Sequence, residues 1–165
     1  MRYLARISAL EYNEDLAAIK SKLIERGEKF AETSLNARRR VAELGERFVS
    51  DGACVLLHGF SRCVMQLLQG AAAAGKHFTC LVTEGRPDEA GRSVVATLRA
   101  NGIPASLILD SAAACLMERV DLVLLGAEGV VENGGIINKV GSFQVATVAK
   151  ALGKPVYVAT ESYKF

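Results

Sequence analysis

Five short apolar runs alternate with stretches of helical character through residues 51–165, and this alternation is the strongest constraint on the fold. The runs are mostly continuous in apolar residues, as strands are when a parallel sheet is covered on both faces. An alternating strand and helix pattern predicts βαβ units and a Rossmann-like parallel α/β sheet flanked by helices. The strands are expected at Ala53–His58, Phe78–Thr83, Ala105–Leu109, Leu122–Leu125 and Val156–Ala159.

Helix signals fill the intervals between these strands. The helices are expected at Arg62–Ala74, Glu89–Ala100, Ser111–Glu118 and Val140–Leu152. Ser111 is suited to cap the third helix, because a serine hydroxyl accepts a hydrogen bond from a free backbone N–H group. Gly75 and Gly153 follow the first and the last helix, where a residue with positive φ commonly ends a helix.

A helical N-terminal segment is predicted for residues 1–50, ahead of the α/β domain at 51–165. Residues 1–12 show no clear periodicity, which suggests either a docked arm or a chain cut from something longer. The chain stops soon after the fifth strand, and no helix follows to cover that side of the sheet. We expect a missing C-terminal piece or a partner chain to cover it, so the α/β domain is predicted to be incomplete at its C-terminal end.

Two helices are predicted inside the N-terminal segment. Apolar residues fall near helical spacing in the range 14–32. Ser34 then suits the N-cap of a second helix that extends to Phe48. Three arginines, Arg38–Arg40, cluster on this second helix. Two explanations of the cluster are open: a solvated helix face, or a contact with phosphate or carboxylate groups.

Composition limits the classes of function. Half of the 165 residues are apolar, which is enough for a sizeable core, and the formal net charge of +2 gives no electrostatic case for nucleic-acid binding. The apolar runs are too short to span a bilayer, and no secretory leader opens the chain. The cysteines lack metal-ligand spacing and only two histidines are present, so no metal site is predicted. We interpret the cysteines as reduced core residues of a cytoplasmic protein: Cys54, Cys63, Cys80 and Cys115.

Polar loops follow three of the expected strands, at residues 58–62, 83–87 and 126–139. In an open parallel sheet, ligands bind beyond the carboxyl ends of the strands, so loops that converge there would form a site. Arginines and the helix N-terminus after Ser61 suit a phosphate group, while carboxylates and Asn138 suit hydroxyl groups. The loops therefore predict a phosphorylated sugar as the ligand.

Structural roles are alternative explanations for the same polar residues. Arg62 could pair with a surface acid, Arg86 could belong to an exposed turn, and Glu128 could hydrogen-bond within its loop. Lys139 at a helix start opposes the helix dipole, which favours an anionic partner there. No glycine-rich dinucleotide fingerprint, P-loop or nucleophile–base pair is evident, so no cofactor and no catalytic residue are predicted.

The stretch Gly126–Gly141, GAEGVVENGGIINKVG, resembles the regulatory alpha, beta and delta subunits of eukaryotic translation initiation factor 2B, and the alpha type most closely. The resemblance covers essentially the whole chain. Members of the family begin with a longer helical domain and continue with more sheet, so the resemblance also implies a truncated chain. Other matching pieces are Ile24–Glu28, Asp51–Ala53, His58, Ser61-Arg62, Val82–Glu84, Pro87-Asp88, Gly91 and Glu161–Phe165.

The same superfamily includes sugar-phosphate isomerases that act on methylthioribose 1-phosphate and ribose 1,5-bisphosphate. In those enzymes, a cysteine in the turn after the first strand and an aspartate in a Gly-Ala-Asp motif carry the aldose–ketose reaction. The matching positions here are Gly59 and Glu128, and a glycine has no side chain to transfer a proton. The resemblance thus implies a non-catalytic protein, with an active isomerase as the alternative. It also implies a vestigial sugar-phosphate or nucleotide pocket at Gly59, Ser61, Arg62, Arg86, Glu128, Asn138 and Lys139.

The resemblance implies a regulatory subunit of the guanine-nucleotide exchange complex for initiation factor 2. Such a subunit would form a homodimer, bridge a complex with beta, delta, gamma and epsilon subunits, and help to sense phosphorylated initiation factor 2. The helices of residues 13–50 would supply part of the contact with the phosphorylated factor, and the exchange chemistry would reside in another subunit. A free-standing metabolite sensor, with the same pocket but no partner chains, is a third hypothesis.

Overall fold

The structure is a computed structural model that describes residues 16–165. The chain divides into two compact units, one ending at Asn36 and the other covering Ala37–Phe165. The expectation for residues 1–12 falls outside the described residues, and the domain boundary after residue 50 stays a prediction. The strands found in the described residues all lie in the second unit.

One helix, α2 (Leu16–Gly45), occupies the described part of the N-terminal segment and continues into the second unit. The prediction of two helices separated at Ser34 is wrong, because Ser34 lies inside this helix. No proline interrupts the segment, and the Thr33 hydroxyl donates to the Lys29 backbone oxygen at 2.8 Å, a bond that a helix interior accommodates. A 3₁₀ turn, η1 (Glu46–Phe48), follows directly.

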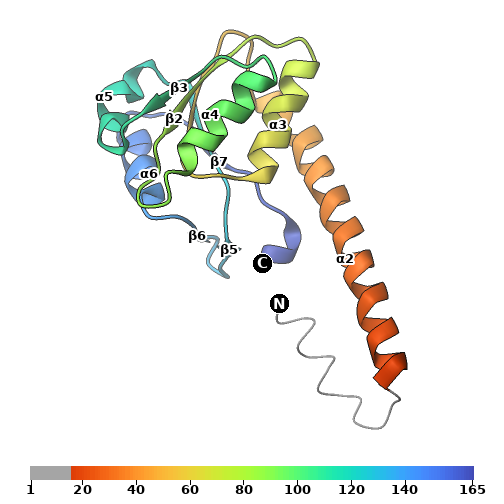
Figure 1. The fold of residues 1–165 in the computed structure, drawn as a ribbon. Helices are drawn as coiled ribbons and strands as arrows, with labels where there is room; N and C mark the ends of the chain where they lie inside the picture. Colours follow the sequence, from red (N-terminus) through yellow and green to blue (C-terminus); the bar gives the residue numbers. More distant parts are fainter. Residues whose placement is uncertain (1–15) are drawn as a thin grey trace. The chain divides into compact units, whose positions relative to one another are not determined.

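Five parallel strands form the central sheet in the order β3-β2-β1-β4-β7 (Figure 1). Their bounds are β1 Cys54–Leu57, β2 Thr79–Thr83, β3 Ala105–Ile108, β4 Leu122–Leu125 and β7 Val156–Val158. The predicted fold class is confirmed, and each strand lies within its predicted range. The chain builds outward from β1 in both directions, so β1 and β4 are neighbours although they are far apart in the sequence.

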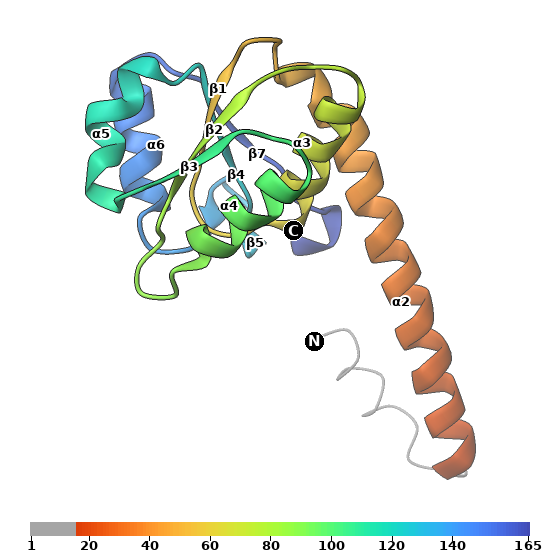
Figure 2. The ribbon, with the colours of Figure 1, turned by 45° about the horizontal axis from the view of Figure 1, so that its top comes forward.

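Helices cover both faces of this sheet (Figure 2). Their bounds are α3 Arg62–Ala73, α4 Ala90–Ala100, α5 Ala113–Leu116 between the 3₁₀ turns η2 Asp110–Ala112 and η3 Met117–Arg119, and α6 Ser142–Ala151. Successive side chains of a strand point to opposite faces. Leu57 therefore joins the core beneath α3 and α4, while Leu56 joins the core beneath α5 and α6. Each of these buried leucines stabilises the fold by about 1.5–3 kcal/mol.

The helix ends follow the sequence signals except at α5. Ser61 is the N-cap of α3, and Gly75 and Gly153 have φ of +84° and +67° just past α3 and α6. The prediction that Ser111 caps a helix is wrong. The chain already turns at Asp110, so Ser111 lies inside η2 and makes no capping hydrogen bond there.

The loop of residues 126–139 is ordered around a small hairpin that the sequence did not predict. Strand β5 (Gly129–Val130) pairs antiparallel with β6 (Ile136–Ile137), and Gly134 has φ of +81° in the turn between them. Strands of two residues are too short to produce a periodic pattern, so the sequence does not predict them. At the C-terminal end, a 3₁₀ turn, η4 (Ser162–Lys164), follows β7.

The cysteines agree with their predicted core positions only in part. Cys63 and Cys80 are buried, and burial raises the pKa of both thiols to about 12. Cys54 is half-buried, but Cys115 is exposed, so its assignment to the core is wrong: in the short helix α5 only Ala113 is buried. All four are free thiols. Between residues 16 and 165, no helix has the length and apolar character of a membrane span, and no three side chains are grouped as metal ligands.

Candidate ligand pocket

A pocket of about 390 Å³ opens beyond the carboxyl ends of β1 and β4. The direction in which strands are added reverses between these two strands, and open α/β sheets bind ligands at such a switch point. The volume of the pocket is in the range of small-molecule sites. Six of the seven residues predicted for the site line it: Gly59, Ser61, Arg62, Glu128, Asn138 and Lys139.

Two glycines allow the loops that follow β1 and β4, called here the β1 exit and the β4 exit, to form one side of the pocket. Gly59 has φ of +75°, a left-handed conformation that glycine adopts without strain. Gly126 approaches Ser61 so closely that an added Cβ would lie 2.6 Å from the Ser61 Cβ. Ser61 caps α3 by accepting a hydrogen bond from the Val64 backbone N–H at 3.4 Å. The N-terminus of α3 therefore lies at the pocket, where its remaining N–H groups favour an anion.

Arg62 and Glu128 bring opposite charges to this pocket. Both side chains are exposed, and neither makes a side-chain hydrogen bond or a close ion pair with another residue in the range 16–165. The described residues therefore contain no acid that pairs with Arg62, contrary to the alternative of a surface ion pair. An arginine with its fork of donors uncommitted can bind a phosphate group through two parallel hydrogen bonds.

Lys139 lies at the edge of the pocket in an ion pair with Asp88 of the β2 exit. The hydrogen bond from Lys139 lowers the pKa of Asp88, and the same contact raises the pKa of Lys139. Both side chains are nearly half exposed, so water screens their attraction. The neighbouring Asn138 donates from its amide nitrogen to the Ser142 hydroxyl at 3.0 Å, which fixes its orientation at the start of α6.

A buried carboxylate, Glu161, supports the pocket from the C-terminal turn. It accepts a hydrogen bond from the Tyr163 hydroxyl at 2.9 Å, and the Lys164 ammonium and Arg38 guanidinium lie 3.0 and 3.5 Å away. Burial alone would raise the pKa of Glu161, but its own backbone N–H, Lys164 and Tyr163 outweigh burial and lower the pKa to about 2. Lys164 also donates to the Ala127 backbone oxygen at 2.6 Å, which ties this turn to the β4 exit.

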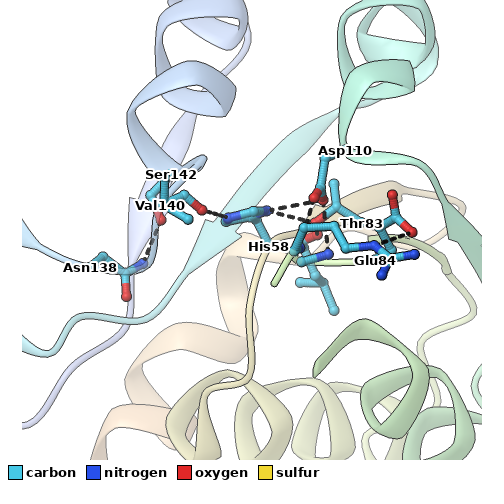
Figure 3. A network of polar contacts seen from close by, with 10 residues as sticks. His58, Thr83, Glu84, Asp110, Asn138, Val140 and Ser142 are labelled. Carbon is cyan, nitrogen blue, oxygen red and sulfur yellow. Dashed lines mark hydrogen bonds and ion pairs between the residues drawn. The ribbon is translucent and has the colours of Figure 1, made fainter. Parts of the chain in front are cut away.

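His58 is buried, lines the pocket and connects three segments (Figure 3). Its Nε2 lies 2.7 Å from the Val140 backbone oxygen, just before α6. Its Nδ1 lies 2.7 Å from the Thr83 hydroxyl at the end of β2 and 3.9 Å from the Asp110 carboxylate. His58, which precedes Gly59, therefore bonds the β1 exit to the end of β2 and to the segment before α6.

The β2 exit lies beside the pocket, but Arg86 is not among the residues that line it. The Asp110 carboxylate accepts hydrogen bonds from the backbone N–H groups of Gly85 and Arg86, both at 2.9 Å. Burial raises the pKa of Asp110, but these two bonds, together with the nearby His58 and Thr83 side chains, outweigh it, so the pKa lies below its ordinary value. The Arg86 guanidinium donates to Glu84 and Glu89. Arg86 thus finds its hydrogen-bond acceptors within its own loop, which agrees with the alternative that it belongs to an exposed turn.

Four charged or titratable residues line the pocket but were not among the predicted site residues: His58, Cys63, Glu161 and Lys164. His58 lies in the polar loop 58–62 that was expected at the site, although it was not chosen as a ligand contact. Periodicity and spacing carry no signal for Glu161 and Lys164, whose neighbours depend on the strand order. The resemblance, which includes both His58 and the segment Glu161–Phe165, was a further signal.

The geometry suits binding of an anion that also carries hydroxyl groups. Arg62, Lys139, Lys164 and the N-terminus of α3 supply positive charge, and Glu128 supplies hydrogen-bond acceptors. Cys63 also lines the pocket, but burial and the nearby Glu161 carboxylate raise its pKa to about 12. Its thiol stays protonated at neutral pH, and a protonated thiol is a poor nucleophile.

Comparisons with known proteins point to one family. The model of the "Initiation factor 2 subunit family" matches residues 1–165. The chain is 45% identical to "Translation initiation factor eIF2B subunit alpha" of Dictyostelium discoideum, over 100% of this chain and 51% of that protein. It is 34% identical to "Ribose 1,5-bisphosphate isomerase" of Archaeoglobus fulgidus, again over 100% of this chain and 51% of that protein.

The fold agrees with solved structures. A chain of the tetrameric eIF2B-beta2-delta2 complex from C. thermophilum superposes with a TM-score of 0.82 at 25% identity, over 99% of this chain and 54% of that chain. The present chain thus spans about half the length of the relatives it matches.

Proposed function

The chain belongs to the initiation factor 2 subunit family, and from this premise we propose that it is a non-catalytic regulatory subunit of the guanine-nucleotide exchange complex for translation initiation factor 2. The observation that carries the proposal is the 45% identity to an eIF2B alpha subunit over the whole of this chain. This identity exceeds the 34% shared with a ribose 1,5-bisphosphate isomerase over the same residues. Because the chain spans half of these relatives, the activity of the whole protein is part of the proposal.

The partners in this proposal are the other subunits of the complex. The chain would form a homodimer and bridge beta, delta, gamma and epsilon subunits in the cytoplasm. Its fold similarity to a chain of an eIF2B-beta2-delta2 complex supports association with such subunits. Phosphorylated initiation factor 2 would be the regulatory input, and neither a nucleic acid nor a membrane is a proposed partner.

The pocket in this proposal takes a sugar phosphate or a nucleotide. The phosphate group would lie between the N-terminus of α3 and the Arg62 guanidinium, with Lys139 at its edge, and the sugar hydroxyls would reach Glu128 and Asn138. The support comes from Arg62, which is exposed at the pocket without an ion-pair partner in the described residues. Its donors are available to an incoming phosphate without breaking a contact of the fold. No cofactor is part of the proposal.

A sugar-phosphate isomerase is the alternative, favoured by the 34% identity to ribose 1,5-bisphosphate isomerase. Two positions weigh against it. Gly59 has no side chain to transfer a proton, and Glu128 is one methylene longer than the aspartate of the resembling enzymes. A Cβ at Gly59 would meet the Lys139 side chain at 3.5 Å, an ordinary contact, although φ of +75° would strain it.

Thermal stability with sugar phosphates and nucleotides, combined with product analysis by NMR in the same samples, tests the ligand and the lack of catalysis together. A ligand at ten times its Kd should raise the unfolding temperature by about 4 °C, and the double variant Arg62→Ala/Lys139→Ala should lose this rise. Aldose–ketose conversion above that of heat-denatured protein would favour the isomerase. The variant Gly59→Cys/Glu128→Asp is the matched control, because it restores the residue pair of the enzymes.

Co-purification with the sister subunits tests the assembly independently of the ligand. The wild-type chain and Arg62→Ala/Lys139→Ala should both co-elute with the beta and delta subunits, since the substitutions lie in the pocket. Elution of the wild-type chain alone, with ligand binding intact, would favour the free-standing metabolite sensor.

A further inference from the structure

The His58 imidazole forms two short hydrogen bonds that point in opposite directions across the fold (Figure 3). A backbone carbonyl only accepts, so Nε2 must carry the proton that is donated to the Val140 oxygen. In the neutral ring, Nδ1 then accepts the proton of the Thr83 hydroxyl at 2.7 Å, in competition with the Leu57 backbone oxygen at 3.4 Å. The neighbouring charged group is Asp110, 3.9 Å from Nδ1. One side chain, 4% exposed, thereby bonds the segment before α6 to the end of β2.

Gly141 shows that the backbone before α6 is fitted to this ring. It has φ of +95°, and an added Cβ would lie 2.6 Å from His58 Cε1. The Ser142 backbone N–H donates to the Lys139 backbone oxygen at 3.1 Å, and the Val145 N–H donates to the Gly141 oxygen at 2.9 Å. The carbonyl that His58 holds therefore belongs to the same tight turn as Lys139.

We propose that His58 is a positioning residue that sets where Asn138 and Lys139 stand at the pocket, through its Nε2–H bond to Val140. The inference deepens the proposed function, and its ligand readout rests on that function. Asn138 and Lys139 directly precede the held carbonyl, so loss of the bond releases the turn that carries them. An apolar side chain in place of His58 would leave the Val140 oxygen and the Thr83 hydroxyl without this partner in a buried place.

Two substitutions separate the two bonds of His58. In His58→Asn, the amide lies near the position of Nδ1, so the Thr83 contact is kept and the Val140 contact is lost. In His58→Gln, the longer side chain reaches the position of Nε2 and keeps a donor for Val140. The pair is matched in polarity and differs by one methylene, so a difference between the two variants reports the Val140 bond.

The experiment measures amide hydrogen exchange at Ser142 and Val145 together with the Kd of ribose 5-phosphate as a probe, in the wild type and both variants. His58→Asn should speed exchange at both amides about tenfold and raise the Kd about tenfold, as for loss of one buried hydrogen bond. His58→Gln should stay within about threefold of the wild type in both measurements. Equal exchange and equal Kd in the two variants would overturn the proposal.

The two proposals fail in distinguishable ways. If the wild type does not bind the probe but the variants differ in exchange, the ligand assignment fails while the positioning role stands. If neither variant folds, nitrogen-15 NMR of the wild-type imidazole at about pH 8, where an ordinary histidine is neutral, still decides. A proton on Nε2 and a bare Nδ1 are expected, and the opposite tautomer would overturn the inference.

Discussion

The exits of β1 and β2 are built alike, yet they treat their arginines in opposite ways. Each strand ends in a turn with a glycine in the left-handed region, with φ of +75° at Gly59 and +72° at Gly85, and each turn leads into a helix on the same face of the sheet. The β2 exit holds Arg86 between two glutamates, while the β1 exit leaves Arg62 at the pocket with no ion pair in the described residues.

The difference separates an arginine that serves the fold from one that is available to another molecule. Asp110 and the two glutamates neutralise the β2 exit from within, so this loop has no need of an external anion. The β1 exit combines an uncommitted guanidinium with the N-terminus of α3. The local sequences already differ in this respect, because the β2 loop carries Glu84 and Glu89 while residues 58–62 carry no acid. Only Asp110 comes from a distant segment.

The largest expected effect tests how rigidly the β2 exit is built. In Gly91→Ala, the new Cβ would lie 2.0 Å from the Thr83 backbone oxygen, which is fixed in the sheet. The free energy of unfolding, measured by urea denaturation, should fall by more than about 3 kcal/mol. Gly70→Ala is the control in α3, because its nearest neighbour is 3.8 Å away and helix propensity should raise stability by up to about 1 kcal/mol. A Gly91→Ala protein of wild-type stability would show that this exit is pliable.

The second largest effect concerns Glu161, the buried carboxylate that lines the pocket. The pKa of Glu161 is about 2 in the fold against an ordinary 4.5, so its charge stabilises the fold above pH 4.5 and this contribution disappears as the pH falls toward 2. The shift corresponds to roughly 3 kcal/mol. Glu161→Gln should lower the free energy of unfolding at neutral pH by about this amount and flatten its decline in acid. The exposed Glu132→Gln is the control, and an equal acid decline in both variants would contradict the assignment.

The two arginines provide the direct test of the comparison. Arg62→Ala should leave the free energy of unfolding within about 0.5 kcal/mol of the wild type but raise the Kd of ribose 5-phosphate about tenfold or more, through loss of charge-assisted hydrogen bonds. Arg86→Ala should do the reverse, with a stability loss of about 0.5–1 kcal/mol from exposed ion pairs and an unchanged Kd. Denaturation and calorimetry measure the two quantities, and a larger Kd change for Arg86→Ala would reverse the roles assigned here.

The smallest effect concerns the Asp88–Lys139 ion pair, which links the β2 exit to the edge of the pocket. Asp88 holds Lys139, so Asp88→Asn should free the ammonium for an anionic ligand and lower the Kd of ribose 5-phosphate by up to about threefold. Both partners are exposed, so the gain should shrink as salt is added. Asp51→Asn, a surface carboxylate at the opposite ends of the strands, is the control. A raised Kd in Asp88→Asn would mean that Asp88 positions Lys139 for the ligand.

Sequence patterns predicted the strands and most helices because those signals are local. A continuous apolar run is enough to place a parallel strand, and the positive φ of Gly75 and Gly153 marks helix ends at the expected positions. The two errors in the helix predictions have different causes. Ser34 is acceptable as a cap and inside a helix, so its identity could not decide between one helix and two. Ser111 follows a residue, Asp110, whose role depends on a distant loop.

The site was predictable only where polar loops follow the predicted strands. Residues 58–62 and 126–139 were expected to meet, and they do, because β1 and β4 are neighbours. The inclusion of Glu161 and Lys164 requires β7 to lie beside β4, which no local pattern encodes. The exclusion of Arg86 from the pocket lining depends on nearby glutamates that a single sequence cannot orient. For Glu161 and Lys164, strand order rather than residue type was the missing information.

The pairing of β1 with β4 also decides when the pocket comes into existence as the chain folds. The Cys54 N–H donates to the Asp121 carboxylate across 67 positions of sequence, so the pocket forms only after a long segment has closed into a loop. Single helices form far sooner than such long-range pairings. A metabolite that fills the pocket would therefore bind only chains that have completed this step. Its cellular concentration would then influence how much newly made protein reaches a form able to assemble.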